Sequence, residues 1–281
     1  MSPGLRKALT AGGILVLILL CVCAVFDREL SAMMFKEASK YGGFFEIAGE
    51  PPAILLSIFS FNVILAARGG VPAKAALFAV AVLNWIYLGL KLAAGFSAES
   101  PAGYAAFCAA GIAAQFVCFA AGRLWMKKRH PGALAGEPDP ALDGFVLACM
   151  RTAVACLLTL FVVSALKGIW GRVRPRDVGE SGSFSWVWIP RFFTGNYSFP
   201  SGHTANAACL ASLAFFADKK KTRILIWILC AAWIVLVAIS RVRGGAHFPT
   251  DVIVGGTVGI ISVAVSPSVV RRLGKRKEST V

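Results

Sequence analysis

Long apolar runs separated by short polar segments constrain this chain more than any other feature of its sequence. Most are about 17 to 25 residues long, the length that an α-helix needs to cross ~30 Å of hydrocarbon. Hydrophobic residues make up 57% of the 281 residues and charged residues only 15%, a balance foreign to ordinary soluble domains. The sequence therefore predicts an all-α integral membrane protein with about eight transmembrane helices, at residues 8–26, 51–67, 75–96, 104–122, 143–166, 203–217, 222–240 and 250–269.

Lysine and arginine residues gather in alternate connections between these runs. Because positive charge is retained in the cytoplasm, the pattern places both termini there and predicts a multi-pass protein of the plasma (inner) membrane. Most of the net charge of +15 follows from this topology, so it requires no nucleic-acid partner. The first run lacks a clean small-x-small cleavage pattern and is predicted to remain as an anchor. The charge pattern is carried by Arg6, Lys7, Arg68, Lys74, Arg123, Lys127, Lys128, Arg129, Lys219, Lys220, Lys221, Arg223, Arg271, Arg272, Lys275, Arg276 and Lys277.

A segment rich in proline and glycine, residues 131–142, divides the chain on the cytoplasmic side. We expect a four-span N-terminal membrane region at 1–130 and a second membrane region with a basic tail at 143–281, which holds every polar cluster. The cysteines all fall inside the apolar runs, where cysteine behaves as a small apolar residue, and they have no metal-ligand spacing. The sequence therefore predicts neither a metal site nor a cofactor.

Three polar clusters emerge on the side opposite to the cytoplasm. Basic residues are less common on that side, so their presence in these clusters indicates a local role. Lys167 and Arg174, the latter followed by proline, come directly after the run 143–166. Pro-Ser-Gly-His at 200–203 opens the run 203–217, and residues 240–251 separate the last two runs. In this topology, all three clusters face the same side of the membrane.

The residue types in these clusters suit a phosphate group. Phosphoryl transfer depends mainly on positioned donors and cations, because negative charge spreads over the equatorial oxygens. Lys167, Arg174 and Arg241 supply cations, and arginine offers paired donors to oxygen. Ser201 and Gly202 stand at a helix start, where N–H groups and the helix dipole favour an anion. We interpret the clusters as a phosphate cradle.

The third cluster also contains a histidine and an aspartate. Pro249 between His247 and Asp251 suits the first position of a helix. The imidazole then lies just ahead of the helix and the carboxylate in its first turn. The carboxylate can hold one ring nitrogen and leave the other to attack.

In order and residue type, Lys-x6-Arg-Pro, Pro-Ser-Gly-His and Ser-Arg-x5-His-x3-Asp resemble the signature of the type 2 phosphatidic acid phosphatase (PAP2) family. That family includes membrane lipid phosphatases and shares its core with vanadium haloperoxidases, and the resemblance covers residues 143 to 269. It implies a C-terminal helical core of this type and a metal-independent phosphoric monoester or diphosphate hydrolase. It also implies that His247 forms a phosphohistidine, that Asp251 holds its tautomer, and that His203 protonates the leaving oxygen and then activates water.

The resemblance implies a lipid phosphate as substrate, turned over at the outer face of the bilayer. Candidates are lipid A, polyprenyl diphosphates, phosphatidylglycerol phosphate and phosphatidate, and the basic, aromatic segment 172–197 favours a bulky polyanionic head group. One alternative is a phosphotransferase that passes the phosphate to a lipid hydroxyl, and another is a non-catalytic lipid transporter or binding protein. The oligomeric state stays open.

Each cluster also has a structural interpretation. Lys167 and Arg174 can be interface anchors, Pro-Ser-Gly a plain helix start, and His247 with Asp251 a capped turn. Arg172 and Arg243 either widen the basic mouth of the site or anchor the chain at the interface. The acidic segment 27–50 is predicted to be an amphipathic piece on the outer surface.

Overall fold

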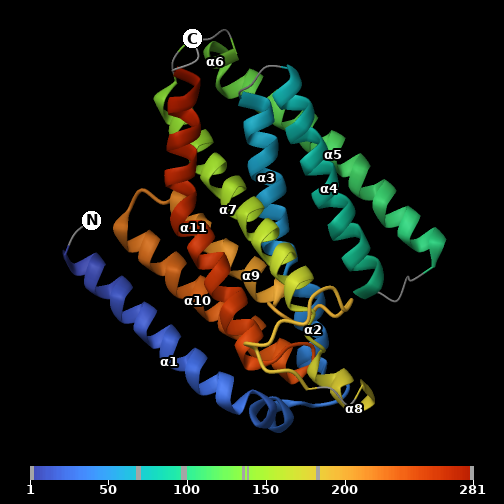
Figure 1. Cartoon of the computed structure of the whole chain (residues 1–281). Coiled ribbons are helices and arrows are strands. Elements are labelled where there is room, and N and C mark those ends of the chain that lie inside the picture. The colour runs from blue at the N-terminus through green and yellow to red at the C-terminus, as the bar shows by residue number, and fades with distance from the viewer. Residues whose placement is uncertain are drawn as a thin grey trace. The chain divides into compact units, whose positions relative to one another are not determined.

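The computed structural model describes residues 3–67, 71–95, 100–134, 137, 139–181 and 184–278. This part of the chain is helical and contains no strand, which confirms the predicted all-α class (Figure 1). Arg68 and residues 135, 136 and 138 of the expected linker lie outside the described residues. The elements are α1 Pro3–Met34, α2 Lys40–Ala48, α3 Pro51–Ala67, α4 Val71–Gly95, α5 Pro101–Arg129, α6 Pro131–Leu134, α7 Pro140–Trp170, η1 Pro175–Asp177, α8 Val178–Ser181, α9 Gly202–Cys209, η2 Leu210–Phe216, α10 Lys220–Arg243 and α11 Pro249–Glu278.

Seven helical stretches within the described residues are long and apolar enough to cross a membrane. The eighth expected stretch, 203–217, differs: it forms the short helix α9 followed by the 3₁₀ helix η2. Its small residues are buried against protein, as Ala205, Ala208, Ala211 and Ser212 show. The stretches are Thr10–Met34, Lys40–Ala67, Lys74–Gly95, Pro101–Arg129, Pro140–Asp177, Lys220–Arg243 and Pro249–Leu273.

The chain forms two compact units, each made of three separate segments. Unit 1 comprises Met1–Gly49, Thr159–Ala208 and Ala231–Ile260. Unit 2 comprises Glu50–Leu158, Cys209–Cys230 and Ile261–Val281. The N-terminal segment through α2 therefore belongs to the same unit as all three polar clusters.

In unit 1, two glycines bring α11 into close contact with the start of α9. A Cβ atom on Gly255 would lie 2.3 Å from the carbonyl oxygen of Ser201, and one on Gly259 would lie 2.5 Å from that of Ala205. Only glycine leaves room for this backbone approach. The contact seats the second polar cluster against the first turns of α11.

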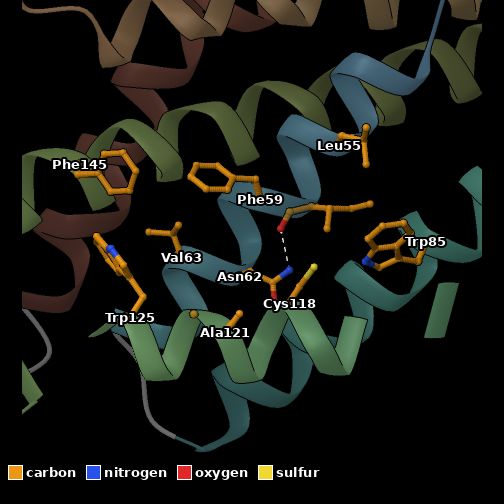
Figure 2. A pocket seen from close by; sticks show the side chains of 11 residues that line it. Leu55, Phe59, Asn62, Val63, Trp85, Cys118, Ala121, Trp125 and Phe145 are labelled. Atoms are coloured by element: carbon orange, nitrogen blue, oxygen red, sulfur yellow. Dashed lines mark hydrogen bonds between the residues drawn. The ribbon is translucent and has the colours of Figure 1, made fainter. Parts of the chain in front are cut away.

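Unit 2 contains α3, α4 and α5 and an apolar cavity of about 580 Å³. Figure 2 shows Phe59, Val63, Trp125 and Phe145 around this space, with Asn62 among them. Asn62 is bound to Gln115 by two reciprocal hydrogen bonds of 3.1 and 3.0 Å. None of the described residues that line the cavity is charged, so they offer none of the cations that a phosphate group requires.

Candidate active site

The three polar clusters come together in unit 1. The first follows the end of α7, the second begins α9, and the third joins α10 to α11. The Ser201 N–H donates to the carbonyl oxygen of Asp251 at 2.9 Å. The Nδ1 atom of His247 lies 2.6 Å from the carbonyl oxygen of Ser198. The second cluster is thus hydrogen-bonded to the third at both ends.

The turn between α10 and α11 depends on Gly245, whose φ of +63° lies in the left-handed region. The Ala246 N–H closes the turn by donating to the Arg241 carbonyl at 3.0 Å, and the Arg176 N–H donates to the Gly245 carbonyl at 3.0 Å. A Cβ atom on Gly245 would meet the Phe35 ring at 2.7 Å. The turn therefore brings His247 close to Arg241, and it also holds the segment that follows Arg174.

The His247 ring is held in one tautomer. A carbonyl oxygen can only accept, so the contact with Ser198 requires the proton on Nδ1 and leaves the lone pair of the neutral ring on Nε2. The residue is 4% exposed. Burial, together with the positive charges of Lys167 and Arg241, lowers the pKa of His247 well below its usual value. The ring is therefore neutral at neutral pH, with an unprotonated Nε2.

Asp251 does not hold His247 in the way that the sequence predicted. Its Oδ2 atom lies 3.9 Å from Nδ1 of His247, which is too long for a hydrogen bond. The carboxylate instead accepts from Ser198 Oγ at 2.6 Å, from the Phe248 N–H at 2.9 Å and from Arg172 Nη1 at 2.6 Å. Since Asp251 lies in the first turn of α11, its carboxylate turns back to cap that helix. It is linked to His247 through two hydrogen bonds of Ser198, one by its hydroxyl and one by its carbonyl oxygen.

Arg172 is the centre of a buried network that the sequence analysis missed. Its side chain is 1% exposed, and its Nη2 atom lies 2.7 Å from Oδ2 of Asp27, which is also 1% exposed. Its Nε donates to the Ser185 carbonyl at 3.0 Å, and its guanidinium lies 4.0 Å from the centre of the Phe248 ring. Arg172 therefore neither widens the mouth nor anchors the interface. Asp27, at the end of a long apolar run, was the available signal, because such a charge needs a partner.

The three predicted cations differ in their surroundings. The Nζ atom of Lys167 donates to the Tyr197 carbonyl at 2.6 Å, and Arg174 is half-buried. The Arg241 side chain is 4% exposed, and its Nη2 lies 3.2 Å from Oε1 of Glu46. Its Nε is buried and finds no hydrogen-bond partner within the described part of the chain. The positive charges of all three contribute to the lowered pKa of His247.

His203 and the start of α9 complete the set. The Nε2 atom of His203 lies 3.1 Å from the carbonyl oxygen of Glu46, so the second residue of α9 is tied to α2. The expected anion-binding amides are only partly available, because the Ser201 N–H is used by Asp251. Gly202 is the first residue of α9, and its N–H has no partner inside the helix. Among the described residues, no group of His, Cys, Asp and Glu is arranged to hold a metal ion.

Comparisons with known proteins find similarity in the part of the chain that carries these clusters. A sequence model of the PAP2 superfamily matches residues 148–275. The chain is 40% identical over 78 residues to phosphatidylglycerophosphatase B of Bacillus subtilis (strain 168), which covers 26% of this chain and 38% of that protein. It is 36% identical over 102 residues to the lipid A 1-phosphatase of Rhizobium etli, which covers 35% of this chain and 40% of the relative. The chain thus spans about two fifths of the curated relatives it matches. No solved structure matches it.

Proposed function

We propose that the chain, whose residues 148–275 match a model of the PAP2 superfamily, is a membrane-embedded lipid phosphatase. It would hydrolyse a phosphate from a lipid phosphate or diphosphate through a phosphohistidine intermediate. The observation that carries this proposal is the buried, neutral His247 ring, with its proton held on Nδ1 and three cations around it.

The proposed reaction has two steps. The Nε2 atom of His247 attacks phosphorus, the bond between phosphorus and the lipid oxygen breaks, and His203 gives that oxygen a proton. His203 then takes a proton from water, whose oxygen attacks the phosphohistidine and frees inorganic phosphate. Lys167, Arg174 and Arg241 bind the phosphoryl oxygens, whose charge they match in both steps. The products are a lipid alcohol and phosphate.

The segment after Arg172 suits a site at the membrane surface. Trp186 and Trp188 stack with ring centres 5.0 Å apart, and Phe193 and Tyr197 are exposed. Exposed aromatic side chains favour the level of the lipid head groups. Because Lys167 is bonded to the Tyr197 carbonyl, this aromatic segment adjoins the cations. A lipid could therefore keep its tails in the bilayer while its head group reaches His247.

We propose the outer face of the inner membrane for this site, because lysine and arginine of the connecting segments favour the opposite side. The names of the two relatives make phosphatidylglycerol phosphate and the 1-phosphate of lipid A the first substrates to test. Polyprenyl diphosphates and phosphatidate complete the panel.

The test is release of inorganic phosphate from each of these lipids by the purified chain in detergent, with EDTA present. We expect release from at least one lipid without any added acceptor, and a loss of more than about 10³-fold in the His247→Ala variant. Phosphate transfer that depends on a lipid hydroxyl would indicate a phosphotransferase instead. Release by His247→Ala at the parent rate would exclude this histidine as the nucleophile.

A further inference from the structure

Glu46, on α2, reaches the proposed phosphate site from outside the family-matched region. Its Oε1 atom lies 3.2 Å from Nη2 of Arg241, although 195 residues separate the two in sequence. The PAP2 match begins at residue 148, so this acidic side chain is an addition of the N-terminal segment. It places a negative charge on one of the three cations that we assign to the substrate phosphate.

The two partners differ strongly in burial. The Arg241 side chain is 4% exposed and the Glu46 side chain 51% exposed. The guanidinium is therefore enclosed by protein, whereas about half of the Glu46 side chain is not covered by protein and has room to move. The buried Nε of Arg241, without a partner in the described residues, marks a donor that Glu46 leaves unused. A phosphate oxygen could accept from it, because a guanidinium offers its donors in a fork.

The backbone of α2 stays in place independently of the Glu46 carboxylate. Ser39 caps the helix by accepting from the Gly42 N–H at 3.1 Å. Phe45 packs in a buried cluster with Ala207 of α9 and Val237 of α10. The main-chain oxygen of Glu46 faces His203 Nε2 at 3.1 Å. The carboxylate can therefore leave Arg241 by a side-chain rotation while the helix remains docked.

We propose that Glu46 is a displaceable counter-ion that occupies Arg241 in the empty site and competes with the substrate phosphate for it. A carboxylate and a phosphate accept hydrogen bonds from the same guanidinium donors, so they cannot share Nη2 fully. This inference rests on the proposed phosphatase function. It makes Glu46 a determinant of how tightly the site holds phosphate, both in the substrate and in the product that must leave.

The test compares the Glu46→Gln variant with the parent chain, purified in detergent at fixed ionic strength. Binding of inorganic phosphate is measured by calorimetry, and inhibition by orthovanadate is measured during lipid hydrolysis. Because the pair is half-exposed, we expect both anions to bind about two- to fivefold more tightly in the variant. KM for the lipid phosphate should fall by a similar factor. Unchanged or weaker anion binding would overturn the proposal.

Two further variants keep the result interpretable. Glu37→Gln removes the same charge from an exposed position in the turn before α2, and its anion binding should equal that of the parent chain. If it also tightens binding, the effect is one of net charge and the role of Glu46 is refuted. Glu46→Ala keeps the main-chain acceptor for His203 and should behave like Glu46→Gln, which guards against a folding defect in either.

The outcomes also separate this inference from the proposed function. If the parent chain releases phosphate from a lipid and Glu46→Gln binds phosphate no better, only the counter-ion role fails. If the parent chain neither releases nor binds phosphate, the phosphatase function fails, and the counter-ion role with it.

Discussion

Oδ2 of Asp27 in α1 lies 2.7 Å from Nη2 of Arg172 after α7, and both side chains are 1% exposed. Asp27 also accepts from the Thr250 N–H at 3.0 Å, at the start of α11. The first helix of the chain is therefore bonded directly to the two segments that carry the proposed chemistry. This explains why the N-terminal segment belongs to the same unit as the site.

The Asp27→Ala variant should be strongly destabilised. Removing one partner of a buried ion pair leaves the other charge uncompensated, which costs about 3–5 kcal/mol of unfolding free energy. The measurement is denaturation in detergent, with Glu29→Gln, an exposed position of the same helix, as a control that should change little. The double variant Asp27→Ala, Arg172→Leu should lose less than the sum of the single losses. Additive losses would show that the pair is not coupled.

The His247 tautomer should survive the loss of the Asp251 charge. Since the Ser198 carbonyl is the acceptor for Nδ1–H, the Asp251→Asn variant should keep the proton on Nδ1 even though Arg172 loses a partner. Nitrogen-15 NMR of labelled histidine can read this, because the chain has only 3 histidines. A switch of the proton to Nε2 would contradict this prediction, because it would show that the Asp251 carboxylate itself keeps the proton on Nδ1.

Stability should fall in mildly acidic solution because of His247. Its pKa in the folded chain is well below the value of about 6.5 for an unperturbed histidine, so the unfolded chain binds more protons below that pH. The contribution of neutral His247 to the free energy of unfolding is fully present above pH ~6.5. It is lost as the pH falls from there toward the lower pKa of the folded chain. Denaturation midpoints of the parent chain and of His247→Gln, measured from pH 5 to 8, check this. Parallel curves for the two proteins would exclude His247 as the source.

Two adjacent glycines on α11 offer a matched test of the packing against α9. The Cβ of Gly255→Ala would lie 2.3 Å from the Ser201 carbonyl oxygen, so the helices must separate, at about 1–3 kcal/mol of stability. That shift would also move the second polar cluster, so phosphate release should fall. The neighbour, Gly256→Ala, meets Ile234 and Thr204 side-chain carbons at an ordinary 3.5 Å and should be neutral or slightly stabilising. Equal effects of the two substitutions would refute the close approach.

The sequence by itself determined the helical membrane class and the identity of the cationic and histidine positions. The membrane class could be predicted because the length of an apolar run shows whether a helix can cross a bilayer. The motif residues could be identified because Lys167 and Arg174, like His247 and Asp251, lie within one short segment. The sequence did not reveal that the run 203–217 is divided into α9 and the 3₁₀ helix η2, because apolar composition carries no information on the type of helix.

Only the tertiary structure decided which groups hold these residues. Ser198 rather than Asp251 sets the His247 tautomer, Asp27 neutralises Arg172 from 145 residues away, and Glu46 meets Arg241 from 195 residues away. These contacts form because α1 and α2 pack against α9, α10 and α11, and no local sequence pattern predicts them. The physical reason is that buried charges and ring protons must be satisfied by whatever groups the fold brings near, however distant they are in the chain.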